Sequence, residues 1–188
     1  AVSKTFPLDK ITPLIKHGHV HFGENKVQEA VQKWSAVKKT NNNIKLHLIG
    51  KLQTNKVKFV LPLFDYIHSL DSIKLAEKIS IEQKKKEFKP KIFIQVNIGN
   101  ENQKNGVAID ELESFYGECK RNYNLDIIGL MCIPPIGNST EFFSKMLELN
   151  NLLNLNELSM GMSSDYLEAL NFKATFVRIG SLIFGERI

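Results

Sequence analysis

Residues 91–98 read KIFIQVNI, and the alternation of side chains in this stretch decides the fold. Successive side chains of a β-strand point to opposite faces. The aliphatic residues share one face: Ile92, Ile94, Val96 and Ile98. The residues between them share the other: Phe93, Gln95 and Asn97. We expect the aliphatic face to pack against surrounding helices and the more polar face to point toward the axis of a barrel.

Similar short strands alternate with amphipathic segments along the whole chain. The strand candidates are residues 1–4, 20–24, 45–50, 66–71, 91–98, 125–133, 157–160 and 176–180. The helix candidates are residues 8–17, 26–39, 55–64, 72–87, 106–121, 140–153 and 163–172. This alternation predicts parallel strands with right-handed crossovers. Eight strands is the number that closes a (β/α)8 barrel, and an open doubly wound sheet is the alternative.

The number of helices is one short for such a barrel, because seven helix candidates lie between eight strand candidates. The tail SLIFGERI, residues 181–188, is too short to be the eighth helix. We therefore expect a helix that precedes Ala1 in the fold and is missing from this sequence.

The composition is that of an ordinary globular protein, with 43% hydrophobic and 24% charged residues among 188. This length predicts one domain, residues 1–188. The apolar runs are too short to span a bilayer. No signal peptide is visible in the sequence. The chain begins at Ala1 rather than at a methionine, so the sequence does not exclude a targeting segment that has been removed. Cys119 and Cys132 stand in apolar or helical surroundings, without a CxxC or metal-ligand spacing. We therefore expect no disulfide, and the reducing cytoplasm is the expected location.

The net charge of +5 raises the question of nucleic-acid binding. The lysines are spread over several predicted helices, and the one dense run, residues 84–86, closes an amphipathic helix. Cations are favourable at a helix C-terminus, so this run is typical of a solvated helix end. We expect neither nucleic acid nor a membrane as a partner.

Strand alternation also predicts which residues point into the barrel near the strand C-termini. It groups Val2 with Lys4, His47 with Ile49, and Phe176 with Arg178. Functional sites of (β/α)8 barrels lie at this end, so we expect Lys4 to face the mouth. A lysine in a partly dry pocket can condense with an aldehyde through its free amine. The alternative is a lysine that extends from the strand end into water.

Two loops at the same end of the barrel are suited to a phosphate. In the loop 159–165, SMGMSSD, Ser163 or Ser164 is a good N-cap, and Gly161 lets the backbone come close to a ligand. The last strand ends in RIGS, which places another glycine and hydroxyl, Gly180 and Ser181, at a strand C-terminus. Barrels commonly hold phosphate in the loops after strands seven and eight. The alternative for the first loop is an ordinary capped helix.

Arg178 has two candidate roles, since it can bind the phosphate directly or donate to a ring nitrogen deeper in the pocket. The alternative is an ion pair with a carboxylate such as Glu24. His21, His47 and His68 stand on different strands without the spacing of a metal site. We expect them to be core or rim residues, and we expect no metal.

Several segments together resemble one known family. They are AVSKT, HFGENKVQEA, HLIGKLQTNK, GLMCIPP, LSMGMSSDYLEA and VRIGSLIFGER, in this order. They closely resemble the pyridoxal phosphate homeostasis proteins, also called the YggS/PROSC family, over nearly the whole chain. The resemblance implies a (β/α)8 TIM barrel of the alanine racemase N-terminal-domain type.

The resemblance also implies a role for individual residues. Lys4 would hold pyridoxal 5′-phosphate as a Schiff base. Arg178 would lie at the pyridine nitrogen, and Asn25 would line the pocket. The phosphate would be bound by Met162, Ser163, Gly180 and Ser181. Relatives often have threonine at position 181, and serine keeps the hydroxyl.

The function implied by the resemblance is storage, buffering or delivery of pyridoxal phosphate inside the cell by a non-catalytic protein. We expect this protein to be a monomer. PLP-dependent apoenzymes are the expected recipients. The alternative is an amino-acid racemase-like enzyme. Two features argue against it: an arginine at the pyridine nitrogen weakens the electron sink that carbanion chemistry needs, and these 188 residues contain no second domain to supply an opposing acid.

Overall fold

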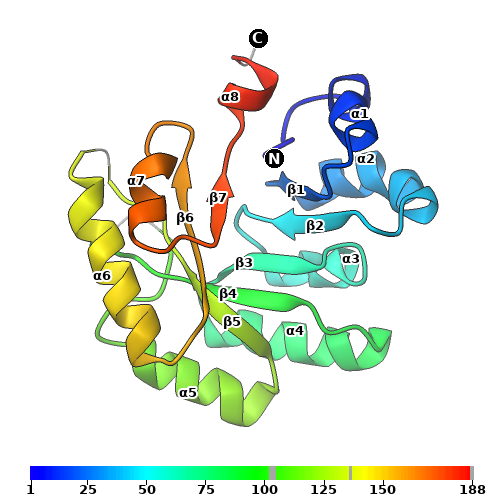
Figure 1. Ribbon diagram of the computed structural model, residues 1–188. Helices are drawn as coiled ribbons and strands as arrows, with labels where there is room; N and C mark the ends of the chain where they lie inside the picture. Colours follow the sequence, from blue (N-terminus) through cyan, green and yellow to red (C-terminus); the bar gives the residue numbers. More distant parts are fainter. Residues whose placement is uncertain (102–104, 136, 187–188) are drawn as a thin grey trace.

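The computed structural model describes residues 1–101, 105–135 and 137–186. Its centre is a single parallel sheet in which seven strands follow each other in sequence order (Figure 1). The strands are β1 (His21–Glu24), β2 (Lys45–Leu48), β3 (Tyr66–Leu70), β4 (Lys91–Gln95), β5 (Asp126–Met131), β6 (Glu157–Met162) and β7 (Phe176–Arg178). Consecutive order of parallel strands is the arrangement that a barrel requires, and an open doubly wound sheet does not have it.

Helices cover the outer face of this sheet (Figure 1). They are α1 (Leu8–Lys16), α2 (Val27–Thr40), the 3-10 helix η1 (Thr54–Lys56), α3 (Val57–Val60), α4 (Ile73–Lys86), α5 (Leu112–Tyr123), α6 (Ser139–Leu152) and α7 (Tyr166–Asn171). The single turn α8 (Ser181–Phe184) lies beyond the end of β7. Among the described residues, none of these helices has both the length and the apolar character needed to cross a membrane.

The barrel is closed by the first three residues, which lie between β7 and β1. The Val2 N–H donates to the Ile179 carbonyl at 2.7 Å, and the Gly23 N–H donates to the Ala1 carbonyl at 2.8 Å. Val2 forms an isolated parallel bridge with Gly23. The predicted strand 1–4 is thus reduced to one bridge, because the chain turns at Thr5 with a φ of 68°. The (β/α)8 fold class is confirmed, and the open-sheet alternative is wrong.

Two predicted helices differ from the structure for local reasons. The helix expected at 55–64 is a 3-10 turn followed by one α-helical turn that ends at Val60, since Pro62 has no N–H for the helix ladder. The helix expected at 106–121 begins only at Leu112. Before it, the Val107 N–H donates to the Gln95 carbonyl at 2.8 Å, so that Val107 extends the sheet as a bridge to Val96.

The two faces of β4 are used as the alternation predicts. Ile92 and Ile94 belong to the apolar layer between sheet and helices, which also contains the fully buried Trp34. Phe93 points the other way and stacks on His68, with 4.3 Å between ring centroids. The inner face of the sheet therefore carries aromatic and imidazole rings, while aliphatic side chains pack on the outer face.

Candidate functional site

All seven candidate residues border one cavity of about 440 Å³ at the C-terminal end of the strands. They are Lys4, Asn25, Met162, Ser163, Arg178, Gly180 and Ser181. The remaining lining residues are Val2, Ile49, Ser164 and Ile133, of which only Ile133 was not expected at this end of the barrel from the sequence. Cavities of roughly 300–1,000 Å³ hold small molecules in other proteins, so this one is large enough for a cofactor.

The segment that carries Lys4 is fixed by a buried polar cluster. The Glu24 side chain is fully buried, and its Oε1 accepts hydrogen bonds from Ser3 Oγ at 2.7 Å and from Trp34 Nε1 at 2.9 Å. Lys33 Nζ lies 3.0 Å from the same oxygen and also donates to the Ser3 carbonyl at 3.1 Å. Ser3 is therefore held by both its hydroxyl and its carbonyl, directly before the half-buried Lys4.

The turn after Lys4 is held in an unfavourable backbone conformation. Thr5 is β-branched and has a φ of 68°, which is rare for such a residue. Its N–H donates to Glu29 Oε1 at 2.8 Å, and α2 supplies this carboxylate. The sharp turn directs the chain away from the barrel immediately after Lys4, so the lysine is the last residue of its segment at the mouth.

The two predicted phosphate loops are joined to each other. Ser163 Oγ accepts a hydrogen bond from the Gly180 N–H at 3.3 Å. In the first loop Gly161 has a φ of +89°, and a Cβ added there would lie 2.7 Å from the Ala169 Cβ. Helix α7 can approach β6 this closely only because residue 161 is glycine.

The expected helix cap in the first loop is wrong by one or two residues. Helix α7 begins at Tyr166, so its N-cap is Asp165 rather than Ser163 or Ser164. The Asp165 carboxylate accepts the Met162 N–H at 2.7 Å. Because Asp165 closes this turn, the hydroxyls of Ser163 and Ser164 remain beside the cavity.

Arg178 is buried, with 8% of its surface exposed, and donates to three oxygens. Its Nη1 donates to the Ser159 carbonyl at 2.8 Å and to Ser159 Oγ at 3.0 Å, and its Nη2 donates to the Cys132 carbonyl at 2.7 Å. The suggested ion pair with Glu24 is wrong, since Glu24 pairs with Lys33. Burial lowers the pKa of Arg178 from its ordinary value. The described residues place no carboxylate within ion-pair distance of Arg178.

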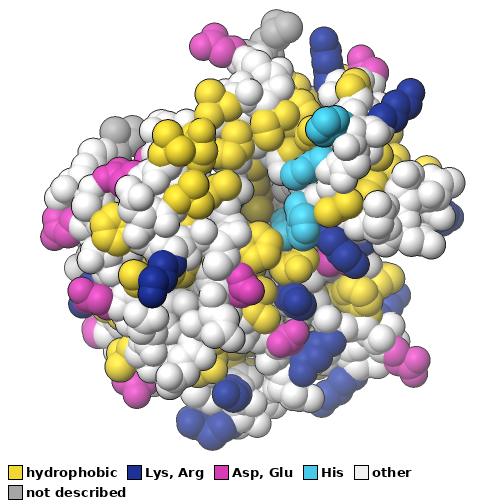
Figure 2. Space-filling model, viewed as in Figure 1, with side chains coloured by type: hydrophobic (Ala, Val, Ile, Leu, Met, Phe, Trp, Pro, Cys, Tyr) yellow, Lys and Arg dark blue, Asp and Glu magenta, His cyan; other side chains and the backbone are white. Residues whose placement is uncertain are grey.

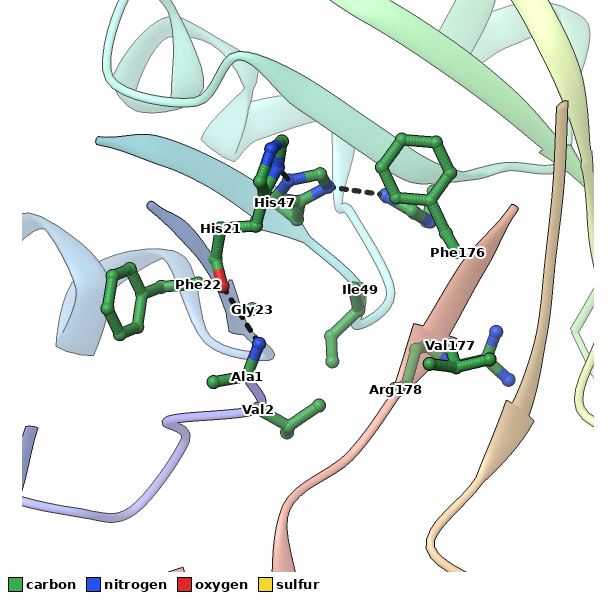
Figure 3. Close-up of a pocket in the computed structure, with 11 residues that line it drawn as sticks. Ala1, Val2, His21, Phe22, Gly23, His47, Ile49, Phe176, Val177 and Arg178 are labelled. Atoms are coloured by element: carbon green, nitrogen blue, oxygen red, sulfur yellow. Dashed lines mark hydrogen bonds between the residues drawn. The ribbon is translucent and has the colours of Figure 1, made fainter. Parts of the chain in front are cut away.

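His21, His47 and His68 point into the barrel and form a hydrogen-bonded row, which lies nearer the strand N-termini than the large cavity. His21 Nδ1 lies 2.9 Å from His47 Nε2, and His47 Nδ1 lies 2.9 Å from His68 Nε2. Figure 3 shows His21 and His47 on adjacent strands, with Phe176 beside them. The row borders a small cavity of about 50 Å³, and Figure 2 shows histidines beside a hollow in one face of the molecule. Burial lowers the pKa of all three imidazoles, for His47 and His68 to well below the ordinary value.

These histidines are core and rim residues, as the sequence predicts. Within the described ranges, no group of three or more His, Cys, Asp or Glu side chains is arranged to hold a metal ion. Both cysteines are buried and free, and burial raises the pKa of the Cys132 thiol to about 12. Neither thiol is therefore a ready nucleophile.

Sequence reasoning missed Ser159, which joins the histidine row to Arg178. His68 Nδ1 lies 2.9 Å from Ser159 Oγ, and the same oxygen accepts from Arg178. The available signal was its place on β6 between Leu158 and Met160, which belong to the apolar core, so that strand alternation puts Ser159 on the opposite, inward face. What remained hidden was the register between β3, β6 and β7, which brings the three side chains together.

Chemically, the large cavity combines an amine, a guanidinium and hydroxyl groups. Lys4 and Arg178 are its two titratable lining residues within the described chain. An amine can bond to a carbonyl carbon, and hydroxyl and backbone N–H groups in glycine-containing loops suit an anion. The arrangement fits a small molecule that carries both a carbonyl and an anionic group.

Comparisons with known proteins show to which family the chain belongs. The family model described as alanine racemase, N-terminal domain, matches residues 1–188. The pyridoxal phosphate homeostasis protein of Aquifex aeolicus is 39% identical over 195 residues, which cover 98% of this chain and 85% of the relative. The Escherichia coli protein of the same name is 34% identical over 198 residues, covering 100% and 84%.

Solved structures give the same result. PipY of Synechococcus elongatus, with PLP bound, is 35% identical with a TM-score of 0.91, covering 98% of this chain and 91% of PipY. Alanine racemase from Corynebacterium glutamicum, 18% identical with a TM-score of 0.72, covers 98% of this chain and 54% of the racemase, and this likeness concerns the fold alone. The chain thus belongs to the pyridoxal phosphate homeostasis protein family, built on the barrel of the alanine racemase N-terminal domain.

Proposed function

We propose that this chain binds pyridoxal 5′-phosphate in the large cavity and serves in its intracellular homeostasis by storage, buffering or delivery, without substantial catalysis. The observation that carries the proposal is that one cavity brings together an inward lysine, a buried arginine and two hydroxyl-bearing loops. The names of the relatives and the PLP-bound PipY structure support the choice of cofactor.

The residues present fit the chemical groups of this cofactor. When bound, pyridoxal 5′-phosphate supplies an aldehyde carbon that condenses with an amine. Lys4 is the amine in the cavity, and its segment is fixed by Glu24 and Lys33. Met162 and Ser163 in one loop, with Gly180 and Ser181 in the other, would bind the phosphate. Asn25 would line the pocket between them.

Arg178 would donate to the pyridine nitrogen. Its guanidinium keeps its protons in a protein, so it presents N–H donors to the ring and does not protonate it. A ring nitrogen without a proton is a weaker electron sink, which disfavours chemistry at the α-carbon of an amino acid. A racemase also needs a second acid or base. The described lining residues offer only Lys4 and Arg178 as titratable groups, so the racemase-like alternative is not favoured.

The proposal includes the covalent link through Lys4, a monomeric state, a cytoplasmic location and PLP-dependent apoenzymes as recipients. The two free, buried thiols support a reducing compartment. The recipients rest on the family resemblance alone.

The first test is the absorption spectrum of the purified protein with PLP, before and after borohydride reduction, followed by peptide mapping. We expect the reduced cofactor on the peptide that contains Lys4. Its recovery only on another lysine would refute the assignment to Lys4, and a spectrum identical to that of free PLP would refute the covalent link altogether.

The second test addresses catalysis. The PLP-loaded protein is incubated with L-alanine in deuterium oxide, and the α-proton is followed by NMR. We expect no exchange beyond that of free PLP at the same concentration. Rapid exchange, or D-alanine formed over many turnovers, would favour the racemase-like alternative.

A further inference from the structure

A continuous row of hydrogen bonds leads from one end of the barrel to Arg178. It starts at the half-buried His21 on β1 and passes through His47 on β2 and His68 on β3 to Ser159 on β6. Each of these three links is 2.9 Å long, and Arg178 Nη1 reaches Ser159 Oγ at 3.0 Å. Five side chains from five strands are thereby joined across the barrel interior.

The donors and acceptors in this row can be assigned from one end. A guanidinium only donates, so Ser159 Oγ accepts from Arg178. The Ser159 hydroxyl proton is then free to donate to His68 Nδ1. A neutral imidazole that accepts at Nδ1 carries its proton at Nε2, so His68 donates to His47. The same reasoning makes His47 donate to His21. All hydrogen bonds then point away from Arg178.

The surroundings favour this neutral arrangement. Burial lowers the pKa of His68, and the positive charge of the neighbouring Arg178 lowers it further. His47 faces the two neighbouring imidazoles, is stacked on Tyr66 with 4.1 Å between centroids, and lies near His19 and the amino group of Ala1. His21 faces Lys45 and that amino group, against the single carboxylate of Asp65. Phe93 and Phe176 pack against His68 without charge.

Arg178 depends on this row for its direction. Its three acceptors are two carbonyls and the Ser159 hydroxyl, and the hydroxyl is the only one of the three that can rotate away. The hydrogen bond to His68 Nδ1 fixes that rotation. Without it, the hydroxyl proton could turn toward the guanidinium and repel it.

We propose that Ser159 and His68, backed by His47 and His21, are positioning residues that aim the Arg178 guanidinium at the cofactor ring. This inference rests on the proposed PLP site. It predicts that affinity for the ring nitrogen is set in part by residues that do not line the large cavity.

The first test uses the protein without cofactor. Long-range ¹H–¹⁵N NMR of the imidazoles at pH 7.5 reports the tautomer of each histidine. We expect His21, His47 and His68 all to be neutral with the proton on Nε2. A proton on Nδ1 of His68, or a charged His68, would overturn the directional row whether or not the protein binds PLP.

The second test compares PLP with its 1-deaza analogue, in which a C–H replaces the pyridine nitrogen. A hydrogen bond from a charged donor makes the wild type prefer PLP by about 10- to 100-fold. Ser159→Ala, and His68→Phe, which keeps a ring against Phe93, should lower this preference at least about threefold. Ser69→Ala is the matched control, because its hydroxyl is equally buried and has no hydrogen-bond partner.

The outcomes separate the two hypotheses. An unchanged preference in Ser159→Ala would overturn the positioning role while leaving PLP binding in place. No PLP binding by the wild type would instead refute the proposed function. The tautomer measurement would then still test the direction of the hydrogen bonds in the histidine row. An equal loss of preference for PLP in Ser69→Ala would also overturn the positioning role, because the removal of a buried hydroxyl without a contact to Arg178 would then have the same effect.

Discussion

At the residue scale, Lys33 has the most consequential position outside the cavity. It neutralises the fully buried Glu24 at 3.0 Å and also binds the Ser3 carbonyl next to Lys4. Only 9% of its side chain is exposed, so the pair is largely desolvated. A buried carboxylate that loses its cation is costly, and here the loss would also loosen the segment that carries the candidate nucleophile.

Lys33→Met should therefore destabilise the protein by about 3–5 kcal/mol and weaken PLP binding. Urea unfolding and a PLP titration measure the two effects. Lys39→Met is the matched control, since Lys39 is exposed on the same helix α2 and should tolerate the change. Equal unfolding free energies of the two variants would show that the buried pair does not stabilise the Lys4 segment.

Ser163 provides a second residue-scale prediction, because its hydroxyl faces the cavity and is already oriented by the Gly180 N–H. If it binds the phosphate, Ser163→Ala should weaken PLP binding about 10-fold, the effect of one charge-assisted hydrogen bond. Pyridoxal, which lacks the phosphate, is the internal control, and its affinity should change little. A parallel loss for both ligands in equilibrium titrations would place the hydroxyl elsewhere in the site.

At the element scale, the sequence predicts most of the barrel, and its errors have local causes. Strand alternation and helical periodicity are properties of a single segment, so β4 and α4 can be predicted from their own residues alone. The helix expected from residue 106 fails because Val107 pairs with Val96, a contact decided by the neighbouring strand rather than by residues 106–121. The shortened helix at 55–64 had a visible cause in Pro62 that periodicity alone overlooks.

The same distinction applies to the candidate site. Lys4, Arg178 and the two glycine-containing loops stand at strand ends, so topology alone gathers them at one mouth. Ser159 could not be assigned a partner in this way, because its contacts to His68 and Arg178 depend on the stagger of three strands. The helix cap at Asp165 depends on loop geometry, and the sequence cannot distinguish it from the adjacent serines, which are equally good N-cap residues.

The C-terminus of α4 offers an element-scale prediction. Glu87 is its C-cap in the left-handed region, with φ 51° and ψ 37°, a conformation that suits glycine better than any residue with a Cβ. Its negative charge is also unfavourable at a helix C-terminus. Glu87→Gly should raise the free energy of unfolding by about 1 kcal/mol. Glu77→Gly, exposed in the middle of the same helix, should lower it by about 1 kcal/mol, and chemical denaturation that gives both variants the same sign would contradict this interpretation.

At the scale of the whole molecule, the barrel interior is divided into two parts. The half nearer the strand N-termini is filled by the rings of His47, His68, Phe93 and Phe176, which leave a cavity of only about 50 Å³. The other half opens into the cavity of about 440 Å³. Arg178 borders both, so the packed half provides a rigid support for the side chain that faces the ligand.

The packed half should make the whole protein sensitive to mild acid. Burial lowers the pKa of His47 and His68 well below about 6.5, their ordinary value, so below that pH the unfolded chain binds protons that the folded chain excludes. Stability then rises with pH and falls as the pH drops below about 6.5, by up to about 1.4 kcal/mol per pH unit for each histidine.

This prediction is checked by urea unfolding at pH 7.5, 6.5 and 5.5. His47→Phe, which can keep the stacking on Tyr66, should reduce the loss between pH 6.5 and 5.5 by about 1 kcal/mol, because one excluded proton is removed. His17→Gln serves as the control variant, since His17 is exposed at the end of α1. Carboxylates with ordinary pKa values titrate near pH 4 and contribute little in this interval. Equal stability of the wild type at pH 6.5 and 5.5 would mean that the buried imidazoles accept protons in the folded state, and the barrel interior would then have to reorganise around them.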